Sequence, residues 1–578
     1  MTPTLVLLSL AMLLALLVHG RLSPAILFVT SAVGYHFVGL VDQSTLLASY
    51  TNPALATLVV LLLISLALER TPLVQGLSNR LLYGRPCWAV LRLTGTVALL
   101  SAFLNNTAVV GALLGPLSRQ THIAPSRVLL PLSYAAILGG VTTLVGTSTN
   151  LVVNSFMVSA GLPPMGLFDL AWVGVPAALA CLGVMALTYH RLPANTSPNA
   201  MATQRYFLEA AVAADSPLVG RSIEANQLRH LEGLFLLEID RQGRLLSPVS
   251  PQEVLQGGDR LVFTGEVEKV SSLQRFAGLQ LFGHRADDLL RANLVEVVLV
   301  PDSELAQKTL RDVDFRTMFD AGVVGIRRGD QELKGQLGRI RLFAGDALLL
   351  AVGSNFAQHR NLDRNFVIVN GAPVRPSLSH RQSTAVVGGF AAVLALSAFN
   401  WVPLLSGLLA LLGALLASRV LSVSELRRRF PFELVLIIGS ALVIARVLQS
   451  SGAATLVSGA IQTLFSGYGP LGALVGVYLV TLVLTEVVTN NAAAALGFPI
   501  GLSAANAFGI DPMPFVLAVC YGASAGFLVP FGYQTHLMVY TPGRYRLQDF
   551  VRFGLPVSIT YSVVVIALLA FSYPFAPR

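Results

Sequence analysis

The sequence predicts an α-helical polytopic membrane protein with two inverted repeats, re-entrant hairpins and broken helices, and two small α/β domains inserted between the halves. Of its 578 residues, 54% are hydrophobic and only 12% are charged, and the mean hydropathy is +0.68. Soluble proteins carry roughly 25% charged residues, so lipid must solvate most of this chain. Apolar stretches fill residues 1–190 and 381–578, whereas charged residues concentrate between them. We therefore predict four domains, at 1–190, 203–285, 286–370 and 381–578.

Predominantly apolar runs justify the individual membrane helices. Those long enough to cross roughly 30 Å of hydrocarbon lie at about 4–20, 24–41, 54–68, 86–104, 128–146 and 168–189, and at about 384–400, 402–418, 432–450, 469–488, 513–531 and 553–573. The stretches 105–117 and 489–508 differ, because each begins at an Asn doublet and contains a proline, Pro116 or Pro499. We expect each to form a re-entrant hairpin whose polar tip meets protein or a water-filled cavity, with the proline ending an arm.

The charged segment contains a second internal repeat, with a constant offset of 87 residues. Both copies contain β-type runs, LFLLEID and LVFTG in the first and VVGIR and ALLLAVG in the second. The pattern predicts two related domains of about 80 residues with strands and a helix. The matched positions are Glu209 with Glu296, Ser216 with Ser303, Ile239 with Ile326, Arg241 with Arg328, and Gly258-Asp259 with Gly345-Asp346.

The net charge of +9 does not indicate a nucleic-acid partner, because no dense Lys/Arg run with interleaved aromatic residues occurs. Many arginines flank apolar segments, as in Arg427-Arg428-Arg429, which is typical of the cytoplasmic flanks of membrane helices. The three cysteines show no disulfide or metal spacing. Arg446 lies within an apolar segment. Its side chain could extend to the membrane surface or pair with another group, and the functional alternative is contact with the substrate.

A polar, glycine-started motif occurs once in each apolar half. Residues Gly146 to Asn154 read GTSTNLVVN, and residues Gly532 to Tyr540 read GYQTHLMVY, which align without a gap. An Asn doublet precedes each motif by about forty residues. Uncharged polar groups in membrane helices often only hold neighbouring helices together. Two clusters with the same order and spacing instead favour a binding site built from two repeats, as in secondary transporters.

Such breaks can bind an anion without a buried positive side chain. The N-terminus of a half-helix carries about half a positive elementary charge and unpaired N–H groups, and hydroxyls and amides complete the hydrogen bonding. Freed backbone carbonyls and Asn oxygens suit a hard cation such as sodium. No Lys or Arg lies inside either motif. Anion and cation binding would therefore depend on each other, which is the basis of symport.

These segments resemble the divalent anion–sodium symporter family, which carries dicarboxylates and sulfate. The chain is most similar to the sulfate-permease-like branch, which carries two TrkA-C domains between its halves. The segments responsible are FLNNTAVV at 103–110, GTSTNLVVN at 146–154, LTEVVTNNAAAAL at 484–496 and PFGYQTHLMVY at 530–540. In the insert, SPLVGRSI and SELAQKTL, with GDRLVF and GDALLL, resemble TrkA-C, a small ligand-binding module of potassium transport systems. Rigid spacers or dimerisation modules are the alternative reading of the insert.

The resemblance implies a substrate site between two hairpin tips and a sodium site between each tip and the broken-helix loop of its own half. The family's Ser-Asn-Thr motif falls on two triplets, so the implied substrate-binding residues are Asn105, Asn106, Thr107, Thr489, Asn490 and Asn491. The implied cation-binding residues are Asn106, Gly146, Thr147, Ser148, Asn150, Asn490, Gly532, Gln534, Thr535 and His536. The resemblance implies Na⁺ as the coupling ion, and no cofactor is expected.

Three residues depart from the family pattern: Asn105 replaces a serine, Asn491 a threonine and His536 an asparagine. An amide in place of a hydroxyl changes size and donor count, which weakens the expectation of dicarboxylate recognition. An imidazole is a poor sodium ligand and titrates near neutral pH. With Glu486, an ionisable residue expected inside the membrane, His536 raises the hypothesis that one coupling ion is a proton. The alternative is that both side chains only satisfy backbone groups.

The resemblance and the motifs together predict a secondary active transporter of a small divalent oxyanion, sulfate first, coupled to sodium or to protons by alternating access. A C4-dicarboxylate symporter is the alternative within transport. An ion channel gated by the TrkA-C-like domains would need a filter resembling TVGYG, and GYQT is not one. A sensor would need an output domain. An enzyme is the least favoured class, since the sequence shows no nucleophile–base pair, phosphate loop or metal cluster.

The expected partners are the divalent anion, the lipid bilayer, a second copy in a homodimer and a small regulatory ligand at the TrkA-C-like domains. We expect a multi-pass protein of the cell inner (plasma) membrane. The insert at 190–380 should then be cytoplasmic, together with the arginine cluster at 427–429.

Overall fold

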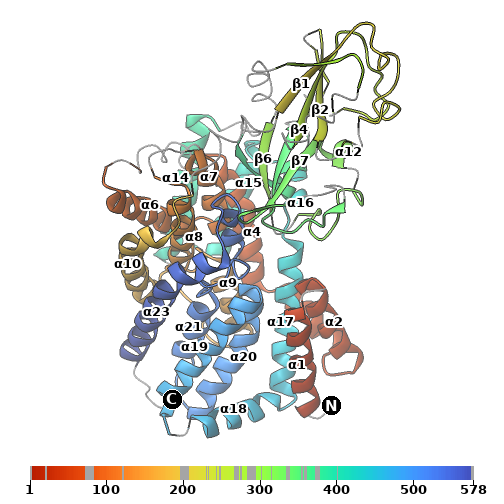
Figure 1. Cartoon of the computed structure of the whole chain (residues 1–578). Helices are drawn as coiled ribbons and strands as arrows, with labels where there is room; N and C mark the ends of the chain where they lie inside the picture. Colours follow the sequence, from red (N-terminus) through yellow and green to blue (C-terminus); the bar gives the residue numbers. More distant parts are fainter. Residues whose placement is uncertain are drawn as a thin grey trace.

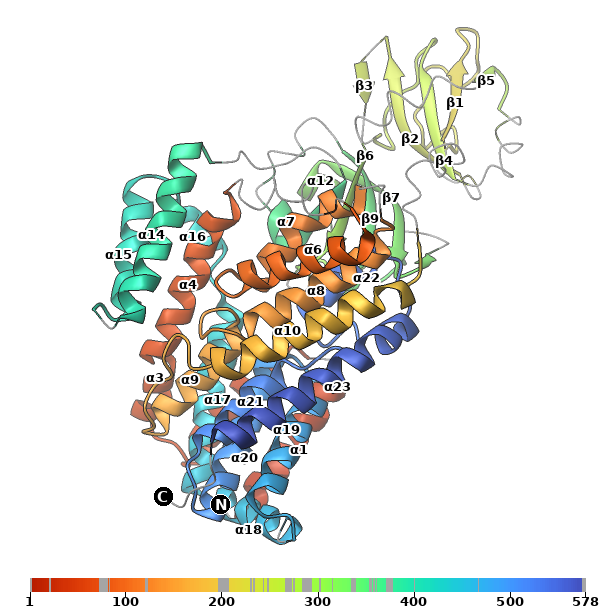
Figure 2. The ribbon, with the colours of Figure 1, turned by 90° about the vertical axis from the view of Figure 1, so that its left-hand side faces the viewer.

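A computed structural model of the whole chain shows a helical bundle that carries two β-sheets at one end (Figure 1). We call the end with the sheets the insert face, and the opposite end, where both termini lie, the far face. The same separation of helices and sheets is visible after a 90° turn (Figure 2). The structure describes residues 3–573 apart from 20–21, 72–81, 83, 120–122, 196–206, 229–230, 232–233, 243, 247–248, 266–272, 274–275, 283–293, 301–302, 314, 334–338, 353–355, 357–358, 360, 371–377, 400 and 466.

Apolar helices, several of them started by proline, form the N-terminal half. Proline suits the first position of a helix, because its φ is already helical and its missing N–H has no partner there. The helices are α1 (Pro3–His19), α2 (Pro24–Phe37), α3 (Gln43–Tyr50), α4 (Pro53–Glu69), α6 (Pro86–Ser101), α7 (Asn106–Arg119), α8 (Ser126–Gly140), α9 (Ser148–Ser159), α10 (Ala171–Thr188) and the 3-10 helix η1 (Tyr189–Arg191).

The insert contains two antiparallel sheets with the same strand order. The first has the order β3-β2-β4-β1-β5 and consists of β1 (Phe207–Val212), β2 (Leu234–Arg241), β3 (Arg244–Leu246), β4 (Arg260–Gly265) and β5 (Leu279–Phe282). The second has the order β8-β7-β9-β6-β10 and consists of β6 (Leu294–Leu299), β7 (Ala321–Arg328), β8 (Gln331–Glu332), β9 (Ala347–Val352) and β10 (Phe366–Asn370), with α12 (Phe315–Phe319) and α13 (Leu362–Asn365). Each sheet has its own apolar core.

One ion pair recurs in both sheets at the offset of 87 residues. Arg241 Nε lies 2.9 Å from Asp259 Oδ1, and Arg328 Nε lies 2.7 Å from Asp346 Oδ1. Both aspartates are buried and belong to the Gly-Asp turn before the last repeated strand. A buried carboxylate needs such a partner, because an unpaired charge is costly away from water. The pair therefore explains why the arginine and the Gly-Asp turn repeat together.

The C-terminal half repeats the helical character of the first. Its helices are α14 (His380–Ala398), α15 (Leu404–Ala417), α16 (Val423–Arg428), α17 (Phe432–Ser450), α18 (Ala453–Leu464), α19 (Gly469–Val487), α20 (Asn490–Phe508), α21 (Met513–Ala523), α22 (Gln534–Tyr540) and α23 (Leu547–Ser572). Among the described residues, five helices are long and apolar enough to cross a membrane: Gln43–Leu68, Ala171–Arg191, Phe432–Ser450, Gly469–Val487 and Leu547–Ser572. An ion pair between Arg70 and Glu425 joins the two halves.

Two helix pairs, α6–α7 and α19–α20, meet at the Asn doublets. The prediction of a whole hairpin within 105–117 and within 489–508 is wrong in extent, because each stretch is one returning helix. The other arms are α6 and α19, within the stretches 86–104 and 469–488, and their crossing of the membrane stays a prediction. The 19-residue arm α19 is among the helices long and apolar enough to cross a membrane, whereas the 16-residue arm α6 is shorter.

The prediction that Pro116 and Pro499 end hairpin arms is also wrong, because both lie inside helices, α7 and α20. A proline removes one backbone hydrogen bond and bends a helix without always ending it. In membrane helices, neighbouring groups can satisfy the freed backbone. The returning arm α20 ends instead at Gly509, whose φ of 63° is the left-handed conformation that favours glycine.

Each half also contains a broken helix. α8 and α9 are separated by residues 141–147, and α21 and α22 by residues 524–533. In both cases the second half-helix begins within the repeated motif, at Ser148 or at Gln534. A hairpin, a broken helix and a long apolar helix therefore follow in the same order in both halves.

The second sheet contacts the same helices that carry the motifs. Thr541, directly after α22, is buried; its hydroxyl donates to the Gly345 carbonyl and accepts from Gly329 N at 3.1 Å. On α7, a Cβ at Gly115 would lie 3.1 Å from the Val369 carbonyl oxygen of β10. Glycine at this position therefore lets the strand approach the helix closely.

Candidate functional site

Asn106 connects the first hairpin tip to the broken helix of its own half. The side chain is only 4% exposed. Its amide nitrogen donates to the carbonyls of Ala136 and Gly146 at 3.1 and 3.2 Å, and its oxygen accepts from the Tyr533 hydroxyl at 2.9 Å. A Cβ at Gly140 would lie 2.8 Å from this amide, so a glycine is required for the tip to fit.

Asn150 closes the break between α8 and α9. Its Nδ2 donates to the Gly140 and Thr143 carbonyls at 3.2 and 2.9 Å, and the Thr143 hydroxyl donates to the Ala102 carbonyl in the tip. Asn150 is fully buried, and its Oδ1 has no hydrogen-bond partner among the described residues. A buried acceptor without a donor is costly, so such an oxygen indicates a bound water or cation.

In the second half, Glu486 supports the corresponding break. Its Oε1 accepts from Leu528 N at 2.9 Å and its Oε2 from Val529 N at 3.1 Å. The neighbouring Thr485 hydroxyl donates to the Ala523 carbonyl at 2.6 Å. Hydrogen bonds from backbone N–H groups to a carboxylate are strong and fix the extended segment. Glu486 thus accepts hydrogen bonds from two backbone N–H groups. Its part in proton coupling stays a prediction.

His536 is fully buried, and both of its ring nitrogens have partners. Nε2 lies 2.8 Å from the Gly526 carbonyl, to which it must donate, and Nδ1 lies 2.7 Å from the Ser133 hydroxyl. The neutral tautomer therefore uses both nitrogens, and no lone pair is left for sodium. Asn150 and His536 each donate to the carbonyl of a glycine ten residues earlier. This geometry favours a positioning role for His536, and its role in cation or proton binding stays a prediction.

The broken helix of each half reaches the hairpin tip of the other half. Ser148 and Thr149, at the start of α9, donate to Asn491 Oδ1 at 3.2 and 3.4 Å. In the reverse direction, the Thr107 hydroxyl lies 3.4 Å from Gln534 Oε1, at the start of α22. Segments more than 300 residues apart therefore meet at one place.

Sequence reasoning missed Tyr533, whose hydroxyl lies between the two halves. It is 3.2 Å from Thr147 Oγ1, contacts Asn106, and has Asn490 within hydrogen-bonding reach. Tyr533 aligns with Thr147 in the repeated motif, and this shared hydroxyl is the pattern that could have found it. Ser133 was also missed, because it lies in α8, outside any repeated segment.

The predicted residues divide into two sets by burial. The set that is exposed or half-buried, and can face a solute, is Asn105, Thr107, Ser148, Thr489, Asn490, Asn491 and Gln534. The buried set, which packs around the two breaks, is Asn106, Gly146, Thr147, Asn150, Gly532, Thr535 and His536. Asn105 also caps α7 by accepting from Thr107 N at 3.0 Å, and Thr489 caps α20. Which residues bind the anion and which the cation stays a prediction.

Several helices begin at this site. The first residues of α7, α9 and α20 are Asn106, Ser148 and Asn490, and the short α22 begins at Gln534. Each helix N-terminus presents unpaired N–H groups and about half a positive elementary charge. Neutral hydroxyls and amides surround these ends. The arrangement can bind an anion and, through free amide and carbonyl oxygens, a hard cation beside it.

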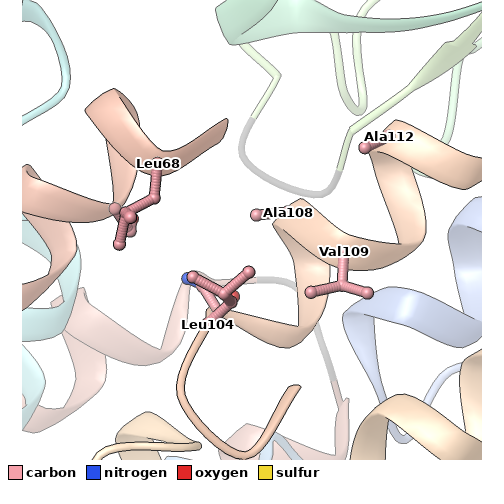
Figure 3. Close-up of a pocket in the computed structure, with 7 residues that line it drawn as sticks. Leu68, Leu104, Ala108, Val109 and Ala112 are labelled. Atoms are coloured by element: carbon pink, nitrogen blue, oxygen red, sulfur yellow. The ribbon is translucent and has the colours of Figure 1, made fainter. Parts of the chain in front are cut away.

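A small cavity lies beside the first tip, between α4 and α7 (Figure 3). Leu68 comes from α4, Asn105 from the tip, and Val109 and Ala112 from α7. The cavity has a volume of ≈ 10 Å³, which is about enough for one water molecule. Its lining residues carry no charge.

The fold and this duplicated polar site define a membrane transporter. The family model described as citrate transporter matches residues 4–520, and the chain belongs to this family. A Chlamydomonas reinhardtii protein, named for a proposed role as a sulfur deprivation response regulator, is 30% identical over 575 residues, 93% of this chain and 96% of that protein. Sodium/sulfate cotransporter 1 of the same organism is 30% identical over 389 residues, 64% of this chain and 44% of that protein.

Among solved structures, the crystal structure of the Alcanivorax borkumensis YdaH transporter matches with a TM-score of 0.42 and 12% identity, covering 93% of this chain and 91% of that one. Similarity at this level carries no argument about the site. The family and its relatives confirm the resemblance to anion symporters. They also make the chain a transporter and not an enzyme. The resemblance of the insert to TrkA-C modules stays a prediction.

Proposed function

We propose that the protein is a secondary active transporter of a small divalent oxyanion, with sulfate as the first candidate and sodium as the coupling ion. The observation that carries this proposal is the crossed contact between the halves, in which each broken helix touches the other half's tip. Relatives named as sodium/sulfate cotransporters support both the anion and the ion.

The anion would lie between the exposed residues of the two tips, including Asn105, Thr107 and Asn491. It would accept hydrogen bonds from these side chains and from the helix N-termini. Cations would bind beside it, one at Asn106 and Asn150 with the 146–150 loop, and one at Asn490 with the 532–536 loop. No Lys or Arg occurs in these segments. A dianion that loses its water there would meet no positive side chain, so cations would have to bind with it to balance its charge.

Transport would proceed by alternating access between two inverted halves. α7 and α22 would border the path to the insert face, and α9 and α20 the path to the far face. We propose that the insert lies in the cytoplasm, that the protein forms a homodimer in the inner membrane, and that the sheet domains bind a small regulatory ligand. A proton in place of one sodium is the alternative coupling ion, through Glu486 and His536.

A carboxylate is the second candidate substrate, because the matching family model is described as a citrate transporter. Asn105 and Asn491 replace hydroxyl residues of the family pattern and favour sulfate. Succinate and citrate would then compete with labelled sulfate more weakly than thiosulfate or molybdate do.

The test is uptake of labelled sulfate into proteoliposomes by Asn106→Ala and Asn490→Ala proteins. We expect each to lower the initial rate by at least tenfold, because each removes an amide from the place where tip and break meet. Asn506→Ala, at an exposed position near the far end of α20, is the matched control and should retain the wild-type rate. Unchanged uptake in both tip variants, or inhibition by succinate and not by thiosulfate, would contradict the proposal.

A further inference from the structure

A second cavity lies toward the far face, where the half-helix α9 and the hairpin arm α20 lead away from the candidate site. It has a volume of ≈ 150 Å³ and is bordered by α3, α9, α17 and α20. Its polar lining residues are Ser49, Ser159, Arg446 and Gln449. Arg446 is the only charged residue in this lining, and in the part of the chain that the structure describes it has no carboxylate partner.

The two cavities include corresponding helices of the two halves, although residues of α3 and α9 also line the large one. The small one lies between α4 and α7, and the large one includes α17 and α20. The helices α4 and α17 each precede the hairpin of their own half, and α7 and α20 are the returning arms of those hairpins. The two cavities differ in charge, because only the far-face cavity contains an arginine. They also differ in size, ≈ 10 against ≈ 150 Å³.

Two stacked phenylalanines, one on α9 and one on α20, line the large cavity. The rings of Phe156 on α9 and Phe498 on α20 are 5.3 Å apart with an interplanar angle of 24°, and both side chains are buried. Each lies eight residues after the start of its helix, at Ser148 or Asn490, which corresponds to about 12 Å along the axis. Both also line the cavity. The aromatic pair therefore belongs both to the lining of the cavity and to the two helices that begin at the candidate site.

We propose that this cavity is a vestibule that binds the divalent oxyanion on its way from the far face, with Arg446 as its anion-attracting group and Phe156 and Phe498 as the barrier to the central site. The proposal rests on the proposed function and adds a second anion site to it. An unpaired guanidinium in a cavity with low-dielectric walls raises the local concentration of an anion. Its planar donors also suit an oxyanion. The small cavity beside the first tip has no charged lining residue.

The test replaces the charge at Arg446 chemically. Arg446→Cys is made together with Cys87→Ser, because the other two cysteines, Cys181 and Cys520, are buried. Purified protein is reconstituted in liposomes, and a membrane-impermeant thiosulfonate that adds either a trimethylammonium or a sulfonate group is applied from one side. The measured quantities are KM and the maximal rate for labelled sulfate supplied from the same side.

We expect Arg446→Cys to raise KM for sulfate at the far face roughly three- to tenfold, as the local anion concentration falls. The maximal rate should stay within about twofold, because the central site is intact. The cationic reagent should restore KM, and the anionic reagent should raise it further. KM for sulfate supplied at the insert face should not change. Arg552→Cys, at an exposed position near the insert-face end of α23, is the matched control and should show no dependence of far-face KM on the reagent's charge.

Equal KM values after both reagents would overturn the vestibule while leaving the proposed function intact. Loss of transport that the cationic reagent does not restore would also overturn it. Absence of sulfate uptake by the unsubstituted protein would instead overturn the proposed function. Phe156→Ala gives a separate readout: it should increase the rate at which the anionic reagent modifies a cysteine placed at Ser148, and an unchanged rate would contradict the barrier.

Discussion

Asn150 and Ser155 lie on the same half-helix, α9, and both are buried with a side-chain oxygen that has no hydrogen-bond partner among the described residues. Only Asn150 lies at the break, where its Nδ2 holds the Gly140 and Thr143 carbonyls. The Oδ1 of the same amide has no donor, and a sodium ion that has lost its water would take such an amide oxygen as a ligand. Ser155 provides a comparison within the same helix.

Asn150→Ala is expected to raise the sodium concentration for half-maximal sulfate uptake by about tenfold, equivalent to about 1.4 kcal/mol of binding free energy. Ser155→Ala should leave that concentration within about twofold, since it removes an equally buried hydroxyl outside the break. The measurement is the sodium dependence of initial uptake rates in proteoliposomes. Equal sodium dependence in the two variants would show that the free oxygen of Asn150 does not contribute to a cation site.

The residues that meet at the site were predictable to the extent that they belong to repeated segments. The tips and motifs recur in the sequence, so Asn106, Asn491 and Gln534 could be identified from one chain. Tyr533 was missed although it lies within the motif, because an aromatic residue there has the composition of ordinary membrane packing. Ser133 was missed because its contact with His536 arises only from tertiary packing between α8 and α22.

At the scale of elements, the connection between the second sheet and α22 is carried by few groups. The Thr541 hydroxyl donates a hydrogen bond to the Gly345 carbonyl of the insert and accepts one from the Gly329 N–H. Close by, Arg546 Nε lies 2.7 Å from Asp330 Oδ2, but both groups are partly exposed, so this pair contributes little. Among the described residues, Thr541 therefore makes the main polar contact between the end of α22 and the second sheet.

Thr541→Val should weaken this docking by about 1–3 kcal/mol, because two buried backbone groups lose their partner. Hydrogen exchange followed by mass spectrometry should then show faster exchange in peptides that contain Gly329 or Gly345. Thr560→Val is the matched control, since the Thr560 hydroxyl donates only to the Pro556 carbonyl within its own helix. Exchange as slow as in the unsubstituted protein would mean that the sheet is held by other contacts.

The sequence predicted helices, sheets and breaks better than it predicted which helices pair. Residues 86–104 and 469–488 are apolar over a span-like length, so a hairpin arm and a crossing helix look the same. Pro116 and Pro499 suggested that a helix ends at each, because proline usually interrupts helices. In the structure α7 and α20 continue on both sides of these prolines, as is tolerated in membrane helices where neighbouring groups satisfy the freed backbone. The close approach of β10 to Gly115 depends on the insert's orientation, which no local pattern contains.

At the scale of the whole molecule, two halves contribute to one site, and the charge balance of transport follows from that. The motifs and tips contain no Lys or Arg, so a dianion can lose its water only in the company of cations and helix ends. The far-face cavity carries the arginine that the central site lacks. On the proposed mechanism, a positive group at the mouth would attract the anion, and its absence at the centre would let the anion leave when the cations leave.

Accumulation of labelled sulfate against its own gradient tests this account most directly. Proteoliposomes containing the purified protein are given an inward sodium gradient, an inward proton gradient, or neither, at equal ionic strength. The account predicts accumulation above equilibrium that requires the sodium gradient, collapses when sodium is equalised, and is lost in Asn106→Ala. Sulfate that only equilibrates under every gradient, or that accumulates equally without sodium, would contradict it.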